Sequence, residues 1–127
     1  MSDQADVDRL IRELHAARVG GDLAAMCRAF AESGSYQIAG SSDGKPVAIA
    51  AKSLAEFKPW LSMMVKAFRV NDYQLLSLVI QGNRGSAHWR ARIHSKITGI
   101  AVLTELVDLI EVRGGRICEY TEFFVPR

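Results

Sequence analysis

The stretch LVDLIEVRGGRICEYTEFF, residues 106–124, decides the fold. It contains two runs of branched and aromatic residues separated by Arg113-Gly114-Gly115, a pattern typical of a β-hairpin. The same two-residue period extends back to Val70, and short turn-like segments separate the runs. The sequence therefore predicts an antiparallel meander of four strands at residues 70–81, 85–96, 100–112 and 116–125.

The residues before this sheet show helical spacing. A first helix is predicted from four apolar residues three and four positions apart, and it should end at Gly20-Gly21. Asp22 is the expected N-cap of a second helix that runs to about residue 33. A short strand at 35–39 and a loop at 40–46 should follow. The apolar stripes of the two helices are Val7, Leu10, Ile11 and Leu14, and Leu23, Met26, Cys27 and Phe30.

A third helix is predicted from Ser53 and Glu56, which have capping-box spacing ahead of a further apolar stripe. Pro59 leaves two alternatives, because the helix either kinks there or begins there. Three helices before one sheet give an α+β class.

Composition limits the functional classes. The chain has 127 residues, 49% of them hydrophobic and 24% charged, which favours one domain spanning 1–127. No apolar run is long enough for a membrane span, and the charged first residues are unlike a signal peptide, so a cytoplasmic location is expected. A net charge of +2 gives no reason to expect nucleic acid or membrane as a partner.

The spacing of the cysteines and histidines predicts no metal site. Cys27 and Cys118 are far apart, and the three histidines form no ligand motif. No phosphate-binding motif is present, and no cofactor is expected.

The order of these elements, with CRAFAESGSYQI at 27–38 and the hairpin at 106–124, resembles the nuclear transport factor 2-like superfamily. The SnoaL-like and ketosteroid isomerase-like branch is the most similar. The resemblance implies a cone in which a curved antiparallel sheet wraps around a long helix. It also implies an apolar pocket at the open end and a homodimer formed through the sheet.

Asp108 is the first candidate for chemistry. By period two it interrupts an apolar face, where desolvation would raise its pKa. The resemblance adds that LVDLIEV matches the strand carrying the oxyanion-hole aspartate of ketosteroid isomerase. The alternative is an aspartate paired with an arginine for structure alone.

Glu122 is the second candidate, and its face depends on the turn. A two-residue Gly114-Gly115 loop would pair Val112 with Ile117 and separate the two acids. A three-residue loop would pair Asp108 with Tyr120 and place both acids on one face, and this register is expected. The alternative role for Glu122 is a solvated carboxylate near the chain end.

Arg90 has two interpretations. The alternation of strand 85–96 places Arg90 and Arg92 on the solvated face, opposite Trp89. The register of limonene epoxide hydrolase, a member of the superfamily, implies the reverse: Arg90, Glu122 and Tyr36 match its pocket residues and Trp89 faces a dimer. Two further residues of that site are replaced here by Arg92 and Ile38, which removes a carboxylate and an amide.

The sequence thus predicts a pocket for a small hydrophobic or polyketide-like molecule between the sheet and the third helix. General acid and base chemistry of isomerase, cyclase or hydrolase type is one hypothesis, with Asp108, Glu122 and Arg90 as catalytic residues. A binding or dimerisation module without turnover is the alternative. His15 is interpreted as a flank residue of the first helix. The expected ligand contacts are Tyr36, Arg92, Tyr120, Phe57, Trp60, Met64 and Leu14.

Overall fold

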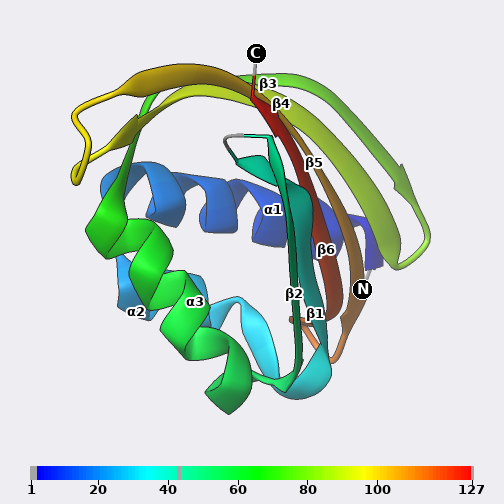
Figure 1. Cartoon of the computed structure of the whole chain (residues 1–127). Helices are drawn as coiled ribbons and strands as arrows, with labels where there is room; N and C mark the ends of the chain where they lie inside the picture. Colours follow the sequence, from blue (N-terminus) through cyan, green and yellow to red (C-terminus); the bar gives the residue numbers. More distant parts are fainter. Residues whose placement is uncertain (1–2, 43, 127) are drawn as a thin grey trace.

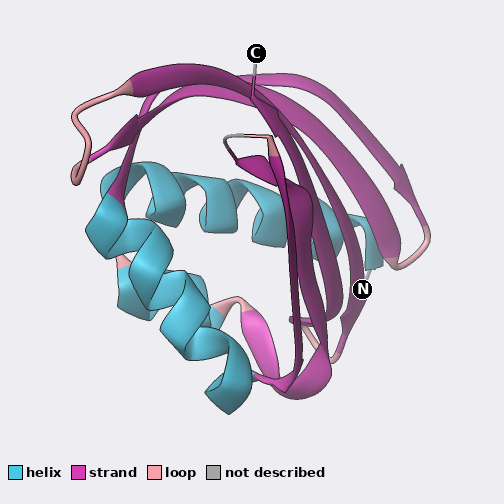
Figure 2. Ribbon diagram, in the orientation of Figure 1, coloured by secondary structure: helices cyan, strands magenta, loops and turns pink. Residues whose placement is uncertain are grey.

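The fold is described by a computed structural model of residues 3–42 and 44–126. Three helices lie on the concave side of one strongly curved sheet, so that α1 crosses beneath the strands (Figure 1). Figure 2 shows the same two layers, with the strands on the outside and the helices inside the curve. The elements are α1 (Asp3–Gly20), α2 (Leu23–Arg28), β1 (Phe30–Ser42), β2 (Lys45–Ser53), α3 (Leu54–Ala67), β3 (Phe68–Gln81), β4 (Arg84–Ser95), β5 (Ala101–Arg113) and β6 (Arg116–Pro126).

The sheet has the order β2-β1-β6-β5-β4-β3. Strands β3 to β6 form the predicted antiparallel meander, which confirms the α+β class. The pairing of β1 with β6 is parallel and was not predicted from the sequence. It joins the hairpin of β1 and β2 to the meander and makes the sheet mixed.

The second helix is shorter than expected. Asp22 caps α2 by accepting from the backbone N–H of Ala25, as expected, but α2 ends at Arg28. The Ile117 N–H donates to the Ala29 carbonyl, so the chain enters β1 there rather than after residue 33. Strands β1 and β2 therefore lie between the second and third helices.

The predicted loop at 40–46 is wrong, because it is mostly strand. β2 follows β1 after a tight turn and forms the edge of the sheet, where Pro46 needs no ladder partner for its nitrogen. Helix α3 begins at the predicted cap: Ser53 accepts from the Glu56 N–H, and Glu56 accepts from the Lys52 N–H. The helix then continues through Pro59.

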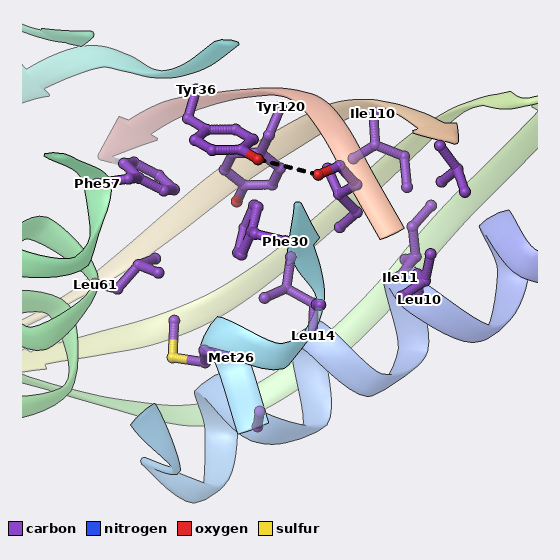
Figure 3. Packing of buried hydrophobic residues seen from close by; sticks show 14 of the residues in the cluster. Leu10, Ile11, Leu14, Met26, Phe30, Tyr36, Phe57, Leu61, Ile110 and Tyr120 are labelled. Carbon is purple, nitrogen blue, oxygen red and sulfur yellow. Dashed lines mark hydrogen bonds between the residues drawn. The ribbon is translucent and has the colours of Figure 1, made fainter. Parts of the chain in front are cut away.

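The core lies between α1, α3 and the concave face of the sheet. Its centre is a group of four aromatic side chains, in which the ring of Phe30 meets Tyr36, Phe57 and Tyr120 edge-on at 5.1 to 5.5 Å (Figure 3). Edge-on pairs add about 1 kcal/mol each beyond the area they bury. No helix of the described residues is long and apolar enough to cross a membrane.

Candidate functional site

The register of the last hairpin brings the two candidate acids together. Gly114 and Gly115 have φ of +58° and +74°, as a two-residue hairpin turn requires, and Val112 pairs with Ile117. The expected three-residue loop is therefore wrong. A register shift next to Val112 then reverses the side-chain alternation, so Asp108 pairs directly with Glu122 on the inner face.

Asp108 is buried and fully hydrogen-bonded. Its Oδ2 accepts from the Trp89 indole N–H at 3.0 Å and lies 2.7 Å from Nε2 of His15, while Oδ1 lies 3.3 Å from the Tyr120 hydroxyl. The indole N–H can only donate, so Oδ2 is an acceptor in this arrangement. The three partners come from β4, α1 and β6, which makes Asp108 a junction between the helix and the sheet.

Glu122 is 1% exposed and is held by a cation and a phenol. Nη1 of Arg18 donates to Oε1, and the Tyr120 hydroxyl lies 3.1 Å from the same oxygen. Burial raises the pKa of Glu122; Arg18 opposes this shift and the charge of Asp108 adds to it. Burial acts to lower the pKa of Arg18, but the charge and hydrogen bond of Glu122, together with the neighbouring Tyr120 and Asp108, outweigh it, so the pKa is raised and the guanidinium stays charged.

Tyr120 bridges the two acids with a single hydrogen. Burial, followed by the charges of Asp108 and Glu122, raises the pKa of Tyr120 well above its ordinary value, so the phenol keeps its proton. That hydrogen can point to one carboxylate only. The second contact becomes a hydrogen bond when the other carboxyl carries a proton and donates to the phenol oxygen. We call these linked side chains the buried polar cluster: His15, Arg18, Tyr73, Trp89, Asp108, Tyr120 and Glu122.

A cavity of about 500 Å³ opens beside the cluster, between α3 and the concave face of the sheet. Arg18, Glu122 and Thr104 are polar groups in its wall, and Met64 lines it from α3. Most of the remaining wall is apolar, from Ile38, Val47, Ile49, Met63, Phe68, Val70, Ile93, Ile100, Val102, Leu106 and Phe124. A ligand here would meet charge at one position and mostly hydrocarbon elsewhere, with hydroxyl groups from Ser41, Ser42, Ser95, Thr98 and Thr104 also in the wall.

The structure separates the predicted site residues other than Arg90 and Arg92 into four groups. Glu122 and Met64 line the cavity, while Asp108 and Tyr120 lie beside Glu122 within the cluster. Trp60 is 38% exposed and is not part of the cavity wall. The others, Leu14, Tyr36 and Phe57, belong to the core, where the Tyr36 hydroxyl donates to backbone carbonyls.

The expectation that Arg90 and Arg92 face the pocket is wrong. Both are exposed on the outer face: Arg90 donates to Gln74, and Arg92 lies 3.6 Å from Asp72. The strand alternation predicted this arrangement correctly. Trp89 lies on the inner face and is 1% exposed. Its ring packs in the core, and its indole N–H donates to Asp108.

The two residues of the cluster that lie on α1 are not predicted by the sequence patterns above. His15, expected at the flank of the first helix, is 3% exposed, and Arg18 pairs with a buried acid. Both extend the stripe of α1, since His15 follows Ile11 by four positions and Arg18 follows Leu14 by four. A polar residue that continues an apolar stripe is the signal that could have found them.

Within residues 3–42 and 44–126, no group of three or more His, Cys, Asp and Glu side chains could hold a metal ion. Cys27 and Cys118 are free thiols.

The fold and the cavity define an α+β protein whose curved sheet surrounds a small-molecule-sized hollow with one charged position. Residues 11–120 match the model of the SnoaL-like domain, and the chain belongs to that family. The family and the fold class thus confirm the resemblance drawn from the sequence.

Solved structures share the fold at low identity. A proposed isomerase from Bacillus subtilis superposes with a TM-score of 0.82 at 16% identity, covering 98% of this chain and 89% of the other. An LEH-like epoxide hydrolase from M. tuberculosis gives 0.74 at 13%, covering 95% and 84%. A proposed polyketide cyclase from Xanthomonas campestris gives 0.73 at 19%, covering 96% and 92%. No curated protein matches the sequence.

Proposed function

We propose that this protein is an enzyme that transfers a proton on a small hydrophobic molecule bound in the cavity, with Glu122 as the acid and base. One observation carries the proposal: Glu122 is buried, yet it lines the cavity beside a charged arginine. A carboxyl whose pKa is raised by burial has a proton affinity closer to neutral pH, which general acid and base catalysis requires.

The geometry gives each neighbour a role. Glu122 would take a proton from the ligand, and the bonding pair left behind would become negative charge on a ligand oxygen. Arg18 lines the same wall and has N–H groups beyond the one donated to Glu122, so it would hydrogen-bond that oxygen. Glu122 would then return the proton to a different atom of the ligand. Asp108 and Tyr120 would hold Glu122 in position.

The names of similar structures agree with this class of reaction. Isomerase, epoxide hydrolase and polyketide cyclase are different activities. General acid and base catalysis is a mechanism that reactions of all three kinds can use. We therefore propose proton transfer as the function. The cavity of about 500 Å³ suits a ligand of hydrophobic or polyketide-like character.

The test does not require the substrate to be identified first. A metabolite library is screened by thermal shift, and the ligands that stabilise the protein are incubated with it in D₂O. NMR then records deuterium incorporation into the ligand. Wild-type protein should accelerate exchange for a subset of ligands. Glu122→Gln should lower that rate by about 100-fold or more while affinity changes little.

Glu119→Gln is the matched control, because Glu119 lies on the same strand but is exposed on the outer face. It should exchange at the wild-type rate. Exchange that survives Glu122→Gln unchanged would refute the role of Glu122.

A binding module without turnover is the second candidate. It is favoured by the completeness of the cluster: among the described residues, no buried side-chain nitrogen or oxygen lacks a hydrogen-bond partner. A purely structural Asp108 predicts that Asp108→Asn loses stability, whereas a catalytic Asp108 predicts stability retained or gained. Ligands that bind the protein but incorporate no deuterium would support a binding module without turnover.

We also propose that the chain forms a homodimer through the sheet. The outer face of β5 and β6 exposes an apolar patch, defined here as Leu103, Leu109, Phe123 and Val125, which are 39% to 56% exposed. A second copy is the occupant that the family resemblance implies.

A further inference from the structure

Strand β3 is irregular, and its backbone is strained at Asp72. Asp72 has φ of +54°, and among the described residues it is the only one other than glycine with positive φ. One register shift, between Asn71 and Gln74, includes Asp72, and a second follows between Leu75 and Ser77. An L residue in this conformation costs about 1 kcal/mol or more.

The ion pair of Asp72 does not explain the strain. Its carboxylate lies 3.6 Å from Arg92, and the two side chains are 77% and 50% exposed, so solvent screens the attraction. The strain at Asp72 is explained by the position that it gives to the next residue, Tyr73. In a regular strand Val70, Asp72 and Gln74 would share the inner face, but the bulge lets Tyr73 and Leu75 pack beside Val70 instead.

Tyr73 thereby reaches His15. The Tyr73 hydroxyl lies 2.6 Å from Nδ1 of His15, and the two rings meet edge-on at 5.4 Å. The indole of Trp89 packs on the same imidazole at 4.8 Å. From His15 the contacts continue without a gap to the cavity, through Asp108 at 2.7 Å, then Tyr120 at 3.3 Å, then Glu122 at 3.1 Å.

We propose that Tyr73 and His15 are positioning residues of the site, and that through Asp108 and Tyr120 they fix the hydrogen bond that Tyr120 makes to Glu122. The inference rests on the role proposed for Glu122. Neither residue lines the cavity, so their effect on a bound molecule is indirect. The bulge at Asp72 turns the Tyr73 side chain toward the imidazole ring of His15.

The charged and titratable groups around the contacts from Tyr73 to Glu122 determine the direction in which the pKa of Glu122 should change. Tyr73 faces Asp108 and Arg12 as well as His15, and Glu122 faces Arg18 and Asp108 as well as Tyr120. In the tautomer that we propose, Nε2 of His15 carries the hydrogen and donates to Asp108, while Nδ1 accepts from the Tyr73 hydroxyl. Loss of that hydroxyl then weakens the donation to Asp108. Asp108 then attracts the hydrogen of Tyr120, and Glu122 loses a donor. A carboxylate that loses a donor binds its proton more tightly.

The experiment follows the titration of Glu122 directly, in protein without ligand. Glutamate is labelled with ¹³C at the side-chain carboxyl, and Glu122→Gln identifies the signal. Tyr73→Phe should raise the midpoint of the Glu122 titration by about half a pH unit, a threefold change in its ionisation constant. Tyr36→Phe is the matched control, because it also removes a buried phenol that bonds to the protein, but outside the chain of contacts. It should leave the midpoint in place.

An unchanged midpoint in Tyr73→Phe overturns the proposal, and so does an equal shift in Tyr36→Phe. A second measurement covers the case in which Tyr73→Phe does not fold. The ¹⁵N spectrum of the His15 ring in the wild-type protein should place a hydrogen on Nε2, and a bare Nε2 overturns the proposal because it cannot donate to Asp108. Absence of ligand exchange would refute the proposed function alone, since neither measurement requires turnover.

Discussion

Replacing Arg18 by methionine should lower the free energy of unfolding, because the buried carboxylate of Glu122 then lacks its positive partner. The side chains of Arg18 and Glu122 are 13% and 2% exposed, so solvent screens their pairing little. Methionine keeps most of the packing of the arginine stem, including contact near the Trp89 ring, over which the guanidinium lies at 5.2 Å. The substitution therefore removes the positive charge and leaves a buried negative one.

The magnitude follows from the proton that Glu122 can take up instead. Protonation at pH 7 of a carboxyl with an ordinary pKa of 4.5 costs about 1.36 kcal/mol per pH unit, or about 3.4 kcal/mol in total. This is the ceiling on the loss, and it agrees with the 3 to 5 kcal/mol lost when buried pairs are broken. We expect about 3 kcal/mol at pH 7, which lowers Tm by about 10 °C in a domain of this size.

The pH dependence has a definite sign. Burial raises the pKa of Glu122 in the folded protein, so the protonated form favours folding. The associated stability is present below the ordinary pKa and is lost as pH rises through the folded-state pKa. Without Arg18 that pKa rises further and the loss at neutral pH grows. At pH 5 the ceiling is only about 0.7 kcal/mol, by the same cost per pH unit.

Urea denaturation at pH 5 and pH 7 measures the difference. Arg18→Met should lie close to wild type at pH 5 and about 3 kcal/mol below it at pH 7. Glu122→Gln added to Arg18→Met should remove the pH dependence. Arg12→Met is the control, because Arg12 pairs with Asp8 on the exposed side of the same helix and should cost under about 0.5 kcal/mol. An equal loss at both pH values would refute the argument.

Two further predictions concern packing and assembly. A Cβ on Gly34 would lie 2.5 Å from the Cys118 carbonyl oxygen and 2.6 Å from the Tyr36 ring, so Gly34→Ala should lose roughly 1 to 3 kcal/mol in urea denaturation. Gly20→Ala, which meets no atom within 4 Å, should lose none. In the apolar patch, Leu109→Glu should halve the mass seen by light scattering at micromolar concentration, whereas Val19→Glu on α1 should not; a wild-type monomer would contradict the dimer.

The sequence predicted those parts of the fold whose signals are local. Period-two alternation over β3 to β6 and the caps Asp22 and Ser53 are set by residues a few positions apart. Strand β2 was missed because its core, VAIAA, is rich in alanine, which has little preference for strands. What makes it a strand is its neighbour β1, and pairing of that kind is a tertiary property.

For the candidate site too, the sequence predicted the residues with a local signal and not those whose partners are distant in the sequence. Asp108 and Glu122 stood out because each interrupts an apolar strand face. Their facing arrangement depends on a bulge that a count from the turn does not reveal. His15 and Arg18 contact acids 93 and 104 positions away, and nothing near them in the sequence marks those partners. For Arg90 the alternation of the strand predicted the outer face correctly, whereas the register of limonene epoxide hydrolase implied the inner face.

The charges of the buried polar cluster favour a neutral ligand. Arg18 interacts with the carboxyl groups of Glu122 and Asp108, and among these three side chains ionisation of both acids leaves one negative charge in excess. A negatively charged ligand would add to that excess in a site with little solvent to screen it. One proton on the Asp108 and Glu122 pair would balance the cluster, and Tyr120, with one hydrogen for two acceptors, is arranged to accommodate it. A site that is one proton from neutrality can both accept and return a proton, which is the reaction proposed for Glu122.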